Sequence, residues 1–169
     1  DGGMTYTVTV SPTAEGQVTL SVPEGAAENI DNVGNLASNT ATVGYDTTSP
    51  IPTVSADQQS PTNAETIVFT VTFDGAVSGF SESDLAVDNG TIDTFIADSA
   101  SVYVISVTAP TTPGDVVLTV PAEVAMDSAG NPNTAATLTL SSDREAPTVA
   151  VTPDALAVAL SPIHFTLTF

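Results

Sequence analysis

Short runs of sequence recur along this chain at a spacing of about 96 residues, and this repeat limits the possible folds more than any other feature. The run Phe69–Phe73 (FTVTF) returns as Phe165–Phe169 (FTLTF), and Tyr103–Val107 (YVISV) repeats Tyr6–Val10 (YTVTV). Three further matches are Val18–Pro23 with Val116–Pro121, Asp31–Asn35 with Asp127–Asn131, and Pro52–Val54 with Pro147–Val149. Such a repeat indicates that one structural unit has been copied along the chain.

The repeat also predicts the domain organisation. Residues 1–46 correspond to the C-terminal half of a unit, residues 52–143 to a complete unit, and residues 147–169 to the opening strands of a third. Residues 47–51 and 144–146 are then linkers. Each partial unit lacks some of its strands, so we expect neither to be stable alone unless another chain supplies the missing part.

Within the complete unit, apolar residues alternate with Thr and Ser, which is typical of half-buried antiparallel strands. Asn89–Gly90 is a hairpin turn signal, and no stretch has a convincing helical period. Seven short strands in a unit of this size predict an all-β fold of tandem immunoglobulin-like β-sandwiches. The predicted strands lie near residues 53–56, 66–73, 83–88, 91–97, 102–108, 115–120 and 136–141.

The composition excludes several classes of partner and chemistry. Asp and Glu number 20 against one basic residue, Arg144, which gives a net charge of −19. Nucleic-acid binding requires Lys and Arg to displace phosphate counterions, so we expect no nucleic-acid partner. No apolar run approaches the roughly 18 residues of a membrane span, so we expect no membrane insertion of this segment. The absence of Cys excludes disulfides and thiolate sites.

The sequence offers no convincing catalytic group. Its single histidine, His164, corresponds to the outward-facing Val68 and has no partner at a fixed spacing. Acidic pairs such as Glu82 and Asp84 arise by chance among 20 acidic residues, and the chain has no Trp to hold a sugar beside them. We therefore predict that the chain is not an enzyme.

Several motifs of the complete unit carry a family resemblance. The alternating run Ile67–Phe73 is followed by Ser83–Leu85, Asn89–Thr91, Val120–Pro121 and the segment Asp127–Asn131 (DSAGN). Together they resemble a bacterial Ig-like domain, the type repeated in tandem in large surface and secreted proteins of the adhesin type. This resemblance implies an extracellular or cell-surface β-sandwich that serves as a rod segment, often with bound calcium, and that carries no catalytic residues.

Two groups of oxygen-bearing residues are candidate calcium sites, since Ca²⁺ takes roughly six to eight oxygen ligands. One is the Asp127–Asn131 loop with its counterpart Asp31–Asn35, and the other is the junction between units. A tight Asp-x-x-Gly-Asn turn explains the loop equally well. In this alignment the first unit carries a two-residue insertion between Pro23 and Asp31. The candidate ligands are Asp31, Asn35, Asp46, Asp74, Asp84, Asp127, Asn131, Asp143 and Glu145.

The leading functional prediction is a structural extender, or stalk segment, whose partners are the neighbouring repeats of the same protein and whose junctions calcium would stiffen. One alternative is a subunit of an extracellular filament or sheath, which would self-assemble into a fibre by strand complementation between chains. Against it, the strands that match residues 74–97 would be missing. A further alternative is a ligand-binding or glycan-binding adhesive module, although only 5% of the residues are aromatic.

Overall fold

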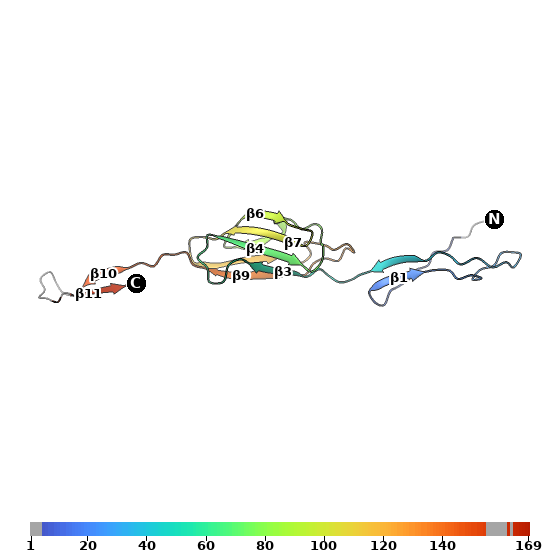
Figure 1. The fold of residues 1–169 in the computed structure, drawn as a ribbon, viewed down its shortest axis with the longest axis horizontal. Coiled ribbons are helices and arrows are strands. Elements are labelled where there is room, and N and C mark those ends of the chain that lie inside the picture. The colour runs from blue at the N-terminus through green and yellow to red at the C-terminus, as the bar shows by residue number, and fades with distance from the viewer. Residues whose placement is uncertain (1–4, 155–161, 163) are drawn as a thin grey trace.

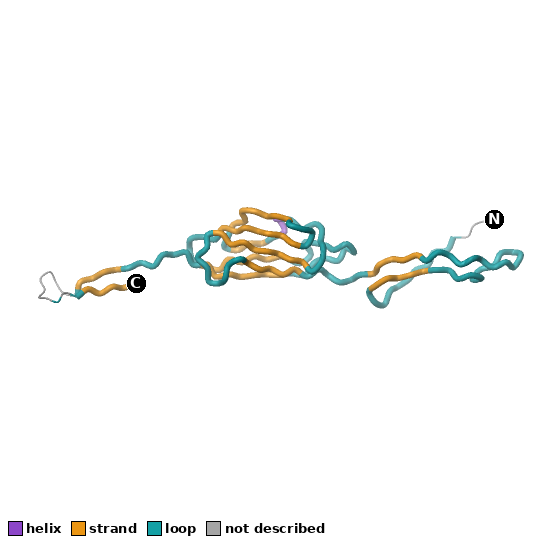
Figure 2. The backbone as a smooth tube through the Cα atoms, in the orientation of Figure 1, coloured by secondary structure: helices purple, strands orange, loops and turns teal. Residues whose placement is uncertain are grey.

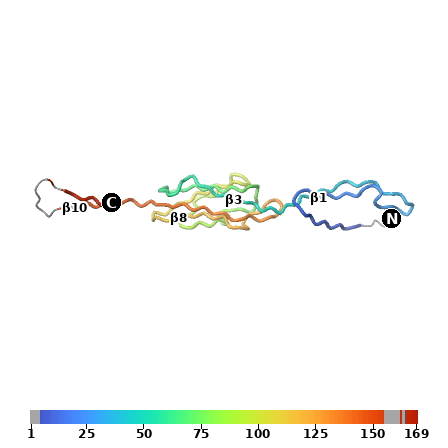
Figure 3. Tube along the Cα trace, turned by 90° about the horizontal axis from the view of Figure 1, so that it is seen from below, coloured from blue at the N-terminus to red at the C-terminus, as the bar shows by residue number. Residues whose placement is uncertain are grey.

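The computed structural model describes residues 5–154, 162 and 164–169, and its strands fall into three groups along the chain (Figure 1). Seven strands form a central β-sandwich, and one two-stranded sheet lies on each side of it. The first of these sheets pairs β1 (Gly16–Leu20) with β2 (Ala41–Tyr45), and the second pairs β10 (Ala150–Pro153) with β11 (Phe165–Thr168). The three groups lie in line, with the sandwich in the middle (Figures 2 and 3).

The central sandwich consists of two antiparallel sheets. Four strands form the larger sheet in the order β3-β4-β7-β6, and three form the smaller sheet in the order β5-β8-β9. β5 and β6 are therefore edge strands, one in each sheet. The strands are β3 (Pro52–Ala56), β4 (Thr66–Phe73), β5 (Ala86–Asp88), β6 (Thr91–Ala97), β7 (Val102–Thr108), β8 (Gly114–Val120) and β9 (Ala136–Ser142).

The alternating sequence pattern places the core between the two sheets. On β4, Ile67, Phe69 and Val71 have no exposed surface, because every second side chain of a strand points to the same face. Phe69 lies opposite Ile105 of β7 in the antiparallel register. β8 contributes Val116, Leu118 and Val120 from the facing sheet, and all three are fully buried. The predicted all-β, Ig-like sandwich is confirmed.

Aromatic side chains fill one end of this core. The rings of Phe73, Phe80 and Tyr103 contact one another edge to face, and the centroids of Phe80 and Tyr103 are 4.8 Å apart. Phe95 stacks on Tyr103 at 5.6 Å. Aromatic pairs in these geometries stabilise a core beyond the area that they bury. These four rings pack against each other rather than forming a platform for a ligand.

Asn89–Gly90 does not close a hairpin, and that prediction is wrong. The turn connects β5, which pairs with β8, to β6, which pairs with β7, so it carries the chain from one sheet to the other. Asn89 has a φ of 54° in the left-handed region. A Cβ on Gly90 would lie 2.7 Å from Cγ1 of Val107, so only glycine fits there. A local turn signal does not reveal which strands its two flanks will join.

One further boundary differs from its prediction. The predicted strand at residues 83–88 begins as a short 3₁₀ turn, Glu82–Asp84, and only Ala86–Asp88 pairs as a strand. Asp84 accounts for the turn, because its Oδ2 accepts hydrogen bonds from both the backbone N–H and the hydroxyl of Ser81, each at 2.7 Å.

No helix in the described part of the chain is long and apolar enough to cross a membrane.

The two flanking sheets repeat parts of the sandwich but have no second layer. β1 pairs Gly16 with Tyr45 in the same register in which β8 pairs Gly114 with Ser142. β10 pairs Val151 with Leu167, as β3 pairs Val54 with Val71. Val54 therefore corresponds to Val151, and the sequence match of Pro52–Val54 with Pro147–Val149 was two residues out of register.

Candidate functional site

Asn133 fixes the conformation of the long loop between β8 and β9. The residue is 2% exposed, and all the hydrogen-bonding atoms of its amide face the loop backbone. Its Oδ1 accepts from the N–H groups of Val124 and Ala125 at 2.9 and 2.7 Å. Its Nδ2 donates to the carbonyls of Pro121 and Thr134 at 2.9 and 2.6 Å. The side chain thus replaces the backbone partners that an irregular buried segment lacks.

Asp127 forms a tight turn at the tip of this loop. Its Oδ1 accepts from the N–H groups of Ala129 and Asn131 at 2.8 and 2.9 Å. Its Oδ2 accepts from Nδ2 of Asn131 at 2.9 Å. The Asn131 side-chain hydrogen bond, helped by the backbone donors, lowers the pKa of Asp127 from its ordinary value. Asp127 and Asn131 therefore lie together, as predicted, and the turn alone explains both.

The same two arrangements recur in the first part of the chain at a spacing of 98 residues. Asn29 takes the place of Asp127, since its Oδ1 accepts from Asp31 N–H and Val33 N–H, each at 3.0 Å. Asn35 takes the place of Asn133: its Oδ1 accepts from Ala27 N–H at 2.8 Å. Its Nδ2 donates to the carbonyls of Pro23 and Leu36 at 3.0 and 2.7 Å.

This spacing corrects the predicted counterparts. Asp31 does not match Asp127, and Asn35 does not match Asn131, so the first segment has no two-residue insertion in this loop. The letters Asp-x-x-Gly-Asn misled the alignment because both loops contain them, two residues out of phase. Asn133 was missed for the same reason, although its spacing from Asn35 was the available signal. Because the neutral amide of Asn29 forms the same turn as Asp127, the turn itself requires no charge.

Three of the predicted ligands meet at the first junction, where the chain enters the sandwich. Asp46, Asp74 and Asp127 line one open groove of about 350 Å³. Asp74 Oδ1 accepts from the Ile51 N–H, and Asp46 Oδ1 from the Thr48 N–H, each at 2.9 Å. Among the residues that the structure describes, no three His, Asp or Glu side chains are grouped so that they could hold a metal ion. Calcium binding remains a prediction.

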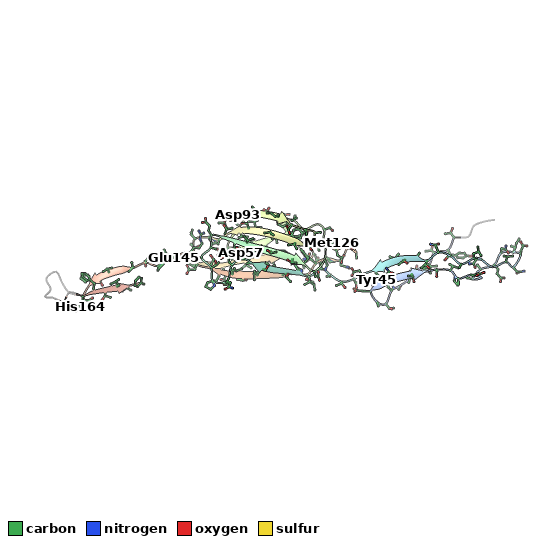
Figure 4. The ribbon with its side chains drawn as sticks, viewed as in Figure 1. Tyr45, Asp57, Asp93, Met126, Glu145 and His164 are labelled. Atoms are coloured by element: carbon green, nitrogen blue, oxygen red, sulfur yellow. The ribbon has the colours of Figure 1, made fainter. Side chains whose placement is uncertain are left out.

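Asn131 lies at the same junction, beside Asp127, and the remaining predicted ligands lie elsewhere. Glu145 lies at the opposite end of the sandwich from Met126, which is close to the first junction (Figure 4). Asp143 forms a turn there, its Oδ1 accepting from the Glu145 N–H at 3.0 Å. Asp84 is held by Ser81, as described above, and does not line the first-junction groove. The two junctions therefore present separate groups of carboxylates.

Two further charged side chains hold the junctions: Glu15, which the sequence did not single out, and Arg144, which lies in the predicted linker 144–146. Glu15 Oε1 accepts from the Thr47 N–H at 3.0 Å and from the hydroxyls of Thr47 and Thr48 at 2.7 and 2.8 Å. These hydrogen bonds lower the pKa of Glu15 from its ordinary value, the Thr47 hydroxyl most of all. At the second junction, Arg144 donates from Nη1 to the Ala109 carbonyl at 2.8 Å. Its Nη2 lies 3.3 Å from Oε2 of Glu65.

His164 lies on the C-terminal two-stranded sheet, away from both junctions (Figure 4). Its backbone carbonyl accepts from the Asp154 N–H at 3.0 Å, just as the Val68 carbonyl accepts from the Asp57 N–H. The match between His164 and Val68 is thus supported by geometry. The residue directly precedes β11, at the position that repeats Val68 of β4.

Comparison with known proteins identifies the central unit. A family model described as a bacterial Ig-like domain matches residues 46–142, which span the first junction and the whole sandwich. No curated protein and no solved structure matches the chain. The matched residues make up more than half of the 169 residues and coincide with the seven-stranded fold described above. The chain therefore belongs to the bacterial Ig-like domain family.

Proposed function

We propose that this chain is a non-catalytic spacer segment of a large bacterial surface or secreted protein of the adhesin type. In this proposal, residues 5–46 and 150–169 are parts of further modules of the same kind as the sandwich. The observation that carries the proposal is that the first junction is hydrogen-bonded to the units on both of its sides, and the second to the sandwich that it leaves. A spacer needs such junctions, because a rod is only as stiff as the connections between its units.

The first junction is held from both of its sides. Glu15, beside β1, binds Thr47 and Thr48, as described above. From the sandwich side, the Thr134 N–H donates to the Pro50 carbonyl at 3.0 Å, and Asn131 Nδ2 donates to the Asp46 carbonyl at 3.3 Å. The junction therefore connects the first sheet to the sandwich through polar contacts on each side.

The second junction is held by the sandwich that it leaves. The Asp143 N–H donates to the Thr62 carbonyl at 2.9 Å, and Arg144 contacts the Ala109 carbonyl and Glu65. The proline at position 147 restricts the backbone just beyond these contacts. The chain enters the sandwich at one end and leaves at the other, so each added unit lengthens the rod (Figure 1).

The acidity of the chain supports the same function. A net charge of −19 makes neighbouring rods repel one another and keeps them dispersed in water. A spacer exposed outside a cell benefits from both effects. The charged surface therefore keeps the chain soluble, while the junctions keep it extended.

Small-angle X-ray scattering tests the proposal. We expect an elongated particle, and Glu15→Ala should broaden its distance distribution by loosening the first junction. Glu24→Ala is the matched control, because Glu24 is an exposed acidic residue of the same segment, outside the junction. A compact profile for the unaltered chain would contradict the proposal, and equal effects of the two substitutions would remove the role of Glu15.

A further inference from the structure

The first and last strands of the sandwich lie side by side but belong to different sheets. β3 is in the four-stranded sheet and β9 is in the three-stranded sheet, and the two strands contact each other (Figure 1). The chain enters the sandwich just before β3 and leaves it just after β9, so both strands run from the first junction towards the second. A pull on the two junctions therefore draws β3 and β9 past each other and must pass from one sheet to the other.

The segment that follows β3 is hydrogen-bonded to the end of β9. The Thr62 N–H donates to the Ser141 carbonyl, and the Asp143 N–H donates to the Thr62 carbonyl, each at 2.9 Å. The Ser141 N–H donates to Oγ of Ser60, also at 2.9 Å. Thr62 and Ser142 form a parallel bridge, so the two segments run in the same direction here. We call these three hydrogen bonds the exit contact.

The exit contact is shielded from water. Thr62 is 8% exposed and Ser142 is 1% exposed. The Thr62 hydroxyl also accepts from the Ala64 N–H at 3.1 Å, which fixes the shape of the segment beside β9. Breaking a buried hydrogen bond leaves its donor and acceptor without partners until water reaches them, so such a bond resists opening more than an exposed one does.

The other end of the same pair of segments has one further hydrogen bond. The Thr134 N–H, just before β9, donates at 3.0 Å to the carbonyl of Pro50, just before β3. This bond is single, whereas the exit contact groups three within a few residues. The exit contact is therefore the stronger of the two connections between the first and last segments of the module.

Each of the two pulled strands is held more firmly within its own sheet than to the other sheet. β9 pairs with β8 from Ala136 to Ser142, and β3 pairs with β4 from Pro52 to Ala56. Between the sheets, the apolar core adds cohesion without direction, because hydrophobic contacts do not fix the position of one layer along the other. The directional resistance to sliding therefore comes from the hydrogen bonds that join β9 to the first segment.

We propose that the exit contact is the load-bearing connection of the module, which resists unfolding when the protein is pulled along its length. Tension draws Thr62 towards the first junction and β9 towards the second, so it acts across the three hydrogen bonds and loads them together. A pull directed across the strands would instead open hydrogen bonds one after another. The proposal deepens the spacer function and rests on it, because only a spacer held at both ends carries tension.

Pulling single molecules of the full chain at constant force tests the proposal, and the absence of cysteine allows the attachment points to be chosen. Ser49→Cys with Thr148→Cys loads the sandwich along its length. Ser49→Cys with Ser128→Cys loads it across the strands, because Ser49 and Ser128 line the same groove at the first junction. At equal force we expect the lengthwise lifetime to be at least about ten-fold longer, since several hydrogen bonds must break together. Equal lifetimes in the two directions would overturn the proposal.

A proline substitution tests the exit contact itself. Asp143→Pro removes the N–H that donates to Thr62, and the residue before it is in a strand, which proline tolerates. It should shorten the lengthwise lifetime by about three- to ten-fold and leave the crosswise lifetime within about two-fold. Asp143→Pro also removes the acceptor of the Glu145 N–H, so Glu145→Pro, which removes that donor, is the matched control and should change neither lifetime by more than about two-fold.

A pair of serine substitutions repeats the test without altering the backbone, in case Asp143→Pro does not fold. Ser60→Ala removes the acceptor of the Ser141 N–H and should shorten the lengthwise lifetime by about three-fold. Ser142→Ala is the control and should not shorten it, because the buried Ser142 hydroxyl has no hydrogen-bond partner in the described part of the chain. Equal effects of contact and control variants would overturn the proposal. The spacer function would stand in that case, because scattering tests it on the chain without load.

Discussion

The central sandwich and the two sheets beside it contain the same pattern of alternating residues, but they differ in what that pattern achieves. In the sandwich, Phe69 is fully buried, whereas its match Phe165 is 58% exposed. The backbone pairing is the same in both, since β10–β11 repeats the register of β3–β4. Alternation is therefore enough to form a strand pair, whereas burial requires a facing sheet.

The largest test of this contrast removes the same ring from each region. We expect Phe69→Ala to destabilise the sandwich by about 3–5 kcal/mol, because the substitution leaves a cavity in a closed core. Phe165→Ala in the monomer should cost less than about 0.5 kcal/mol, as expected for an exposed site. Urea denaturation followed by far-ultraviolet circular dichroism measures both. Similar costs at the two positions would mean that the flanking sheet is packed after all.

The second test compares the two loop asparagines. Asn133→Ala should destabilise the sandwich by about 2–3 kcal/mol, since it leaves buried backbone groups without partners. Asn35→Ala removes the matching hydrogen bonds from a more exposed loop, where water can replace them. It should lower the free energy of unfolding by less than about 1 kcal/mol. Thermal unfolding of the two variants beside the parent gives both values. Equal losses would show that burial is not what makes the amide important.

A third test concerns the second junction. Arg144→Ala should destabilise the sandwich by about 1 kcal/mol through the lost hydrogen bond to the Ala109 carbonyl. Glu65→Gln should cost less than about 0.5 kcal/mol, because the Glu65 side chain is 73% exposed and an exposed ion pair contributes little. Denaturant midpoints of the two variants separate these contributions. If Glu65→Gln loses more stability than Arg144→Ala, the ion pair, and not the hydrogen bond to Ala109, holds the second junction.

A fourth test uses pH to distinguish the two matching turns. The pKa of Asp127 is lowered by the Asn131 side chain and the turn N–H groups, so the turn gains stability above the ordinary pKa of an aspartate. That gain should be lost as the pH falls through the lowered pKa. The Asn29 turn has no carboxylate among its acceptors and should not change with it. Amide shifts of Asn131 and Val33 measured by NMR across acidic pH report the two turns, and parallel changes would contradict this explanation.

The smallest expected effect is that of calcium. The Asp127 carboxylate already accepts three hydrogen bonds within its turn, and Asn29 forms the equivalent turn with a neutral amide. We therefore expect the melting temperature in millimolar calcium and in EGTA to agree within about 1 °C, well below what a 1 kcal/mol ligand effect would give. A clear rise with calcium would confirm the calcium site predicted at the first junction.

The sequence alone predicted the parts of this structure that depend on local pattern. Alternation located the seven strands and their buried faces, and the repeat matched β11 to β4 correctly. Neither alternation nor the repeat reveals the partners of β5 and β6, because each pairs with a strand other than its neighbour in sequence across the Asn89–Gly90 turn. The turn was therefore predicted to close a hairpin. Pattern matching also aligned the Asp-Gly-Asn letters of two loops, whereas hydrogen bonding aligns Asn35 with Asn133.

The candidate site was only partly predictable for a related reason. The gathering of Asp46, Asp74 and Asp127 around one groove follows from their placement next to a junction, which the repeat had located. Asp143 was predicted at the second junction and lies there, whereas Asp84 was predicted at the first junction but is held by Ser81, a contact that the repeat pattern does not report. The contacts of Glu15 and Arg144 join residues more than 30 positions apart, which no local motif reports.

The position of Arg144 has a practical consequence for handling the protein. It is the only lysine or arginine in the sequence, so a protease that cleaves after basic residues has a single peptide bond to attack. That bond lies between the sandwich and β10–β11, and the guanidinium that such an enzyme must grasp is already engaged by Ala109 and Glu65. Slow digestion would trim away the last 25 residues as one fragment and leave the rest of the polypeptide uncut.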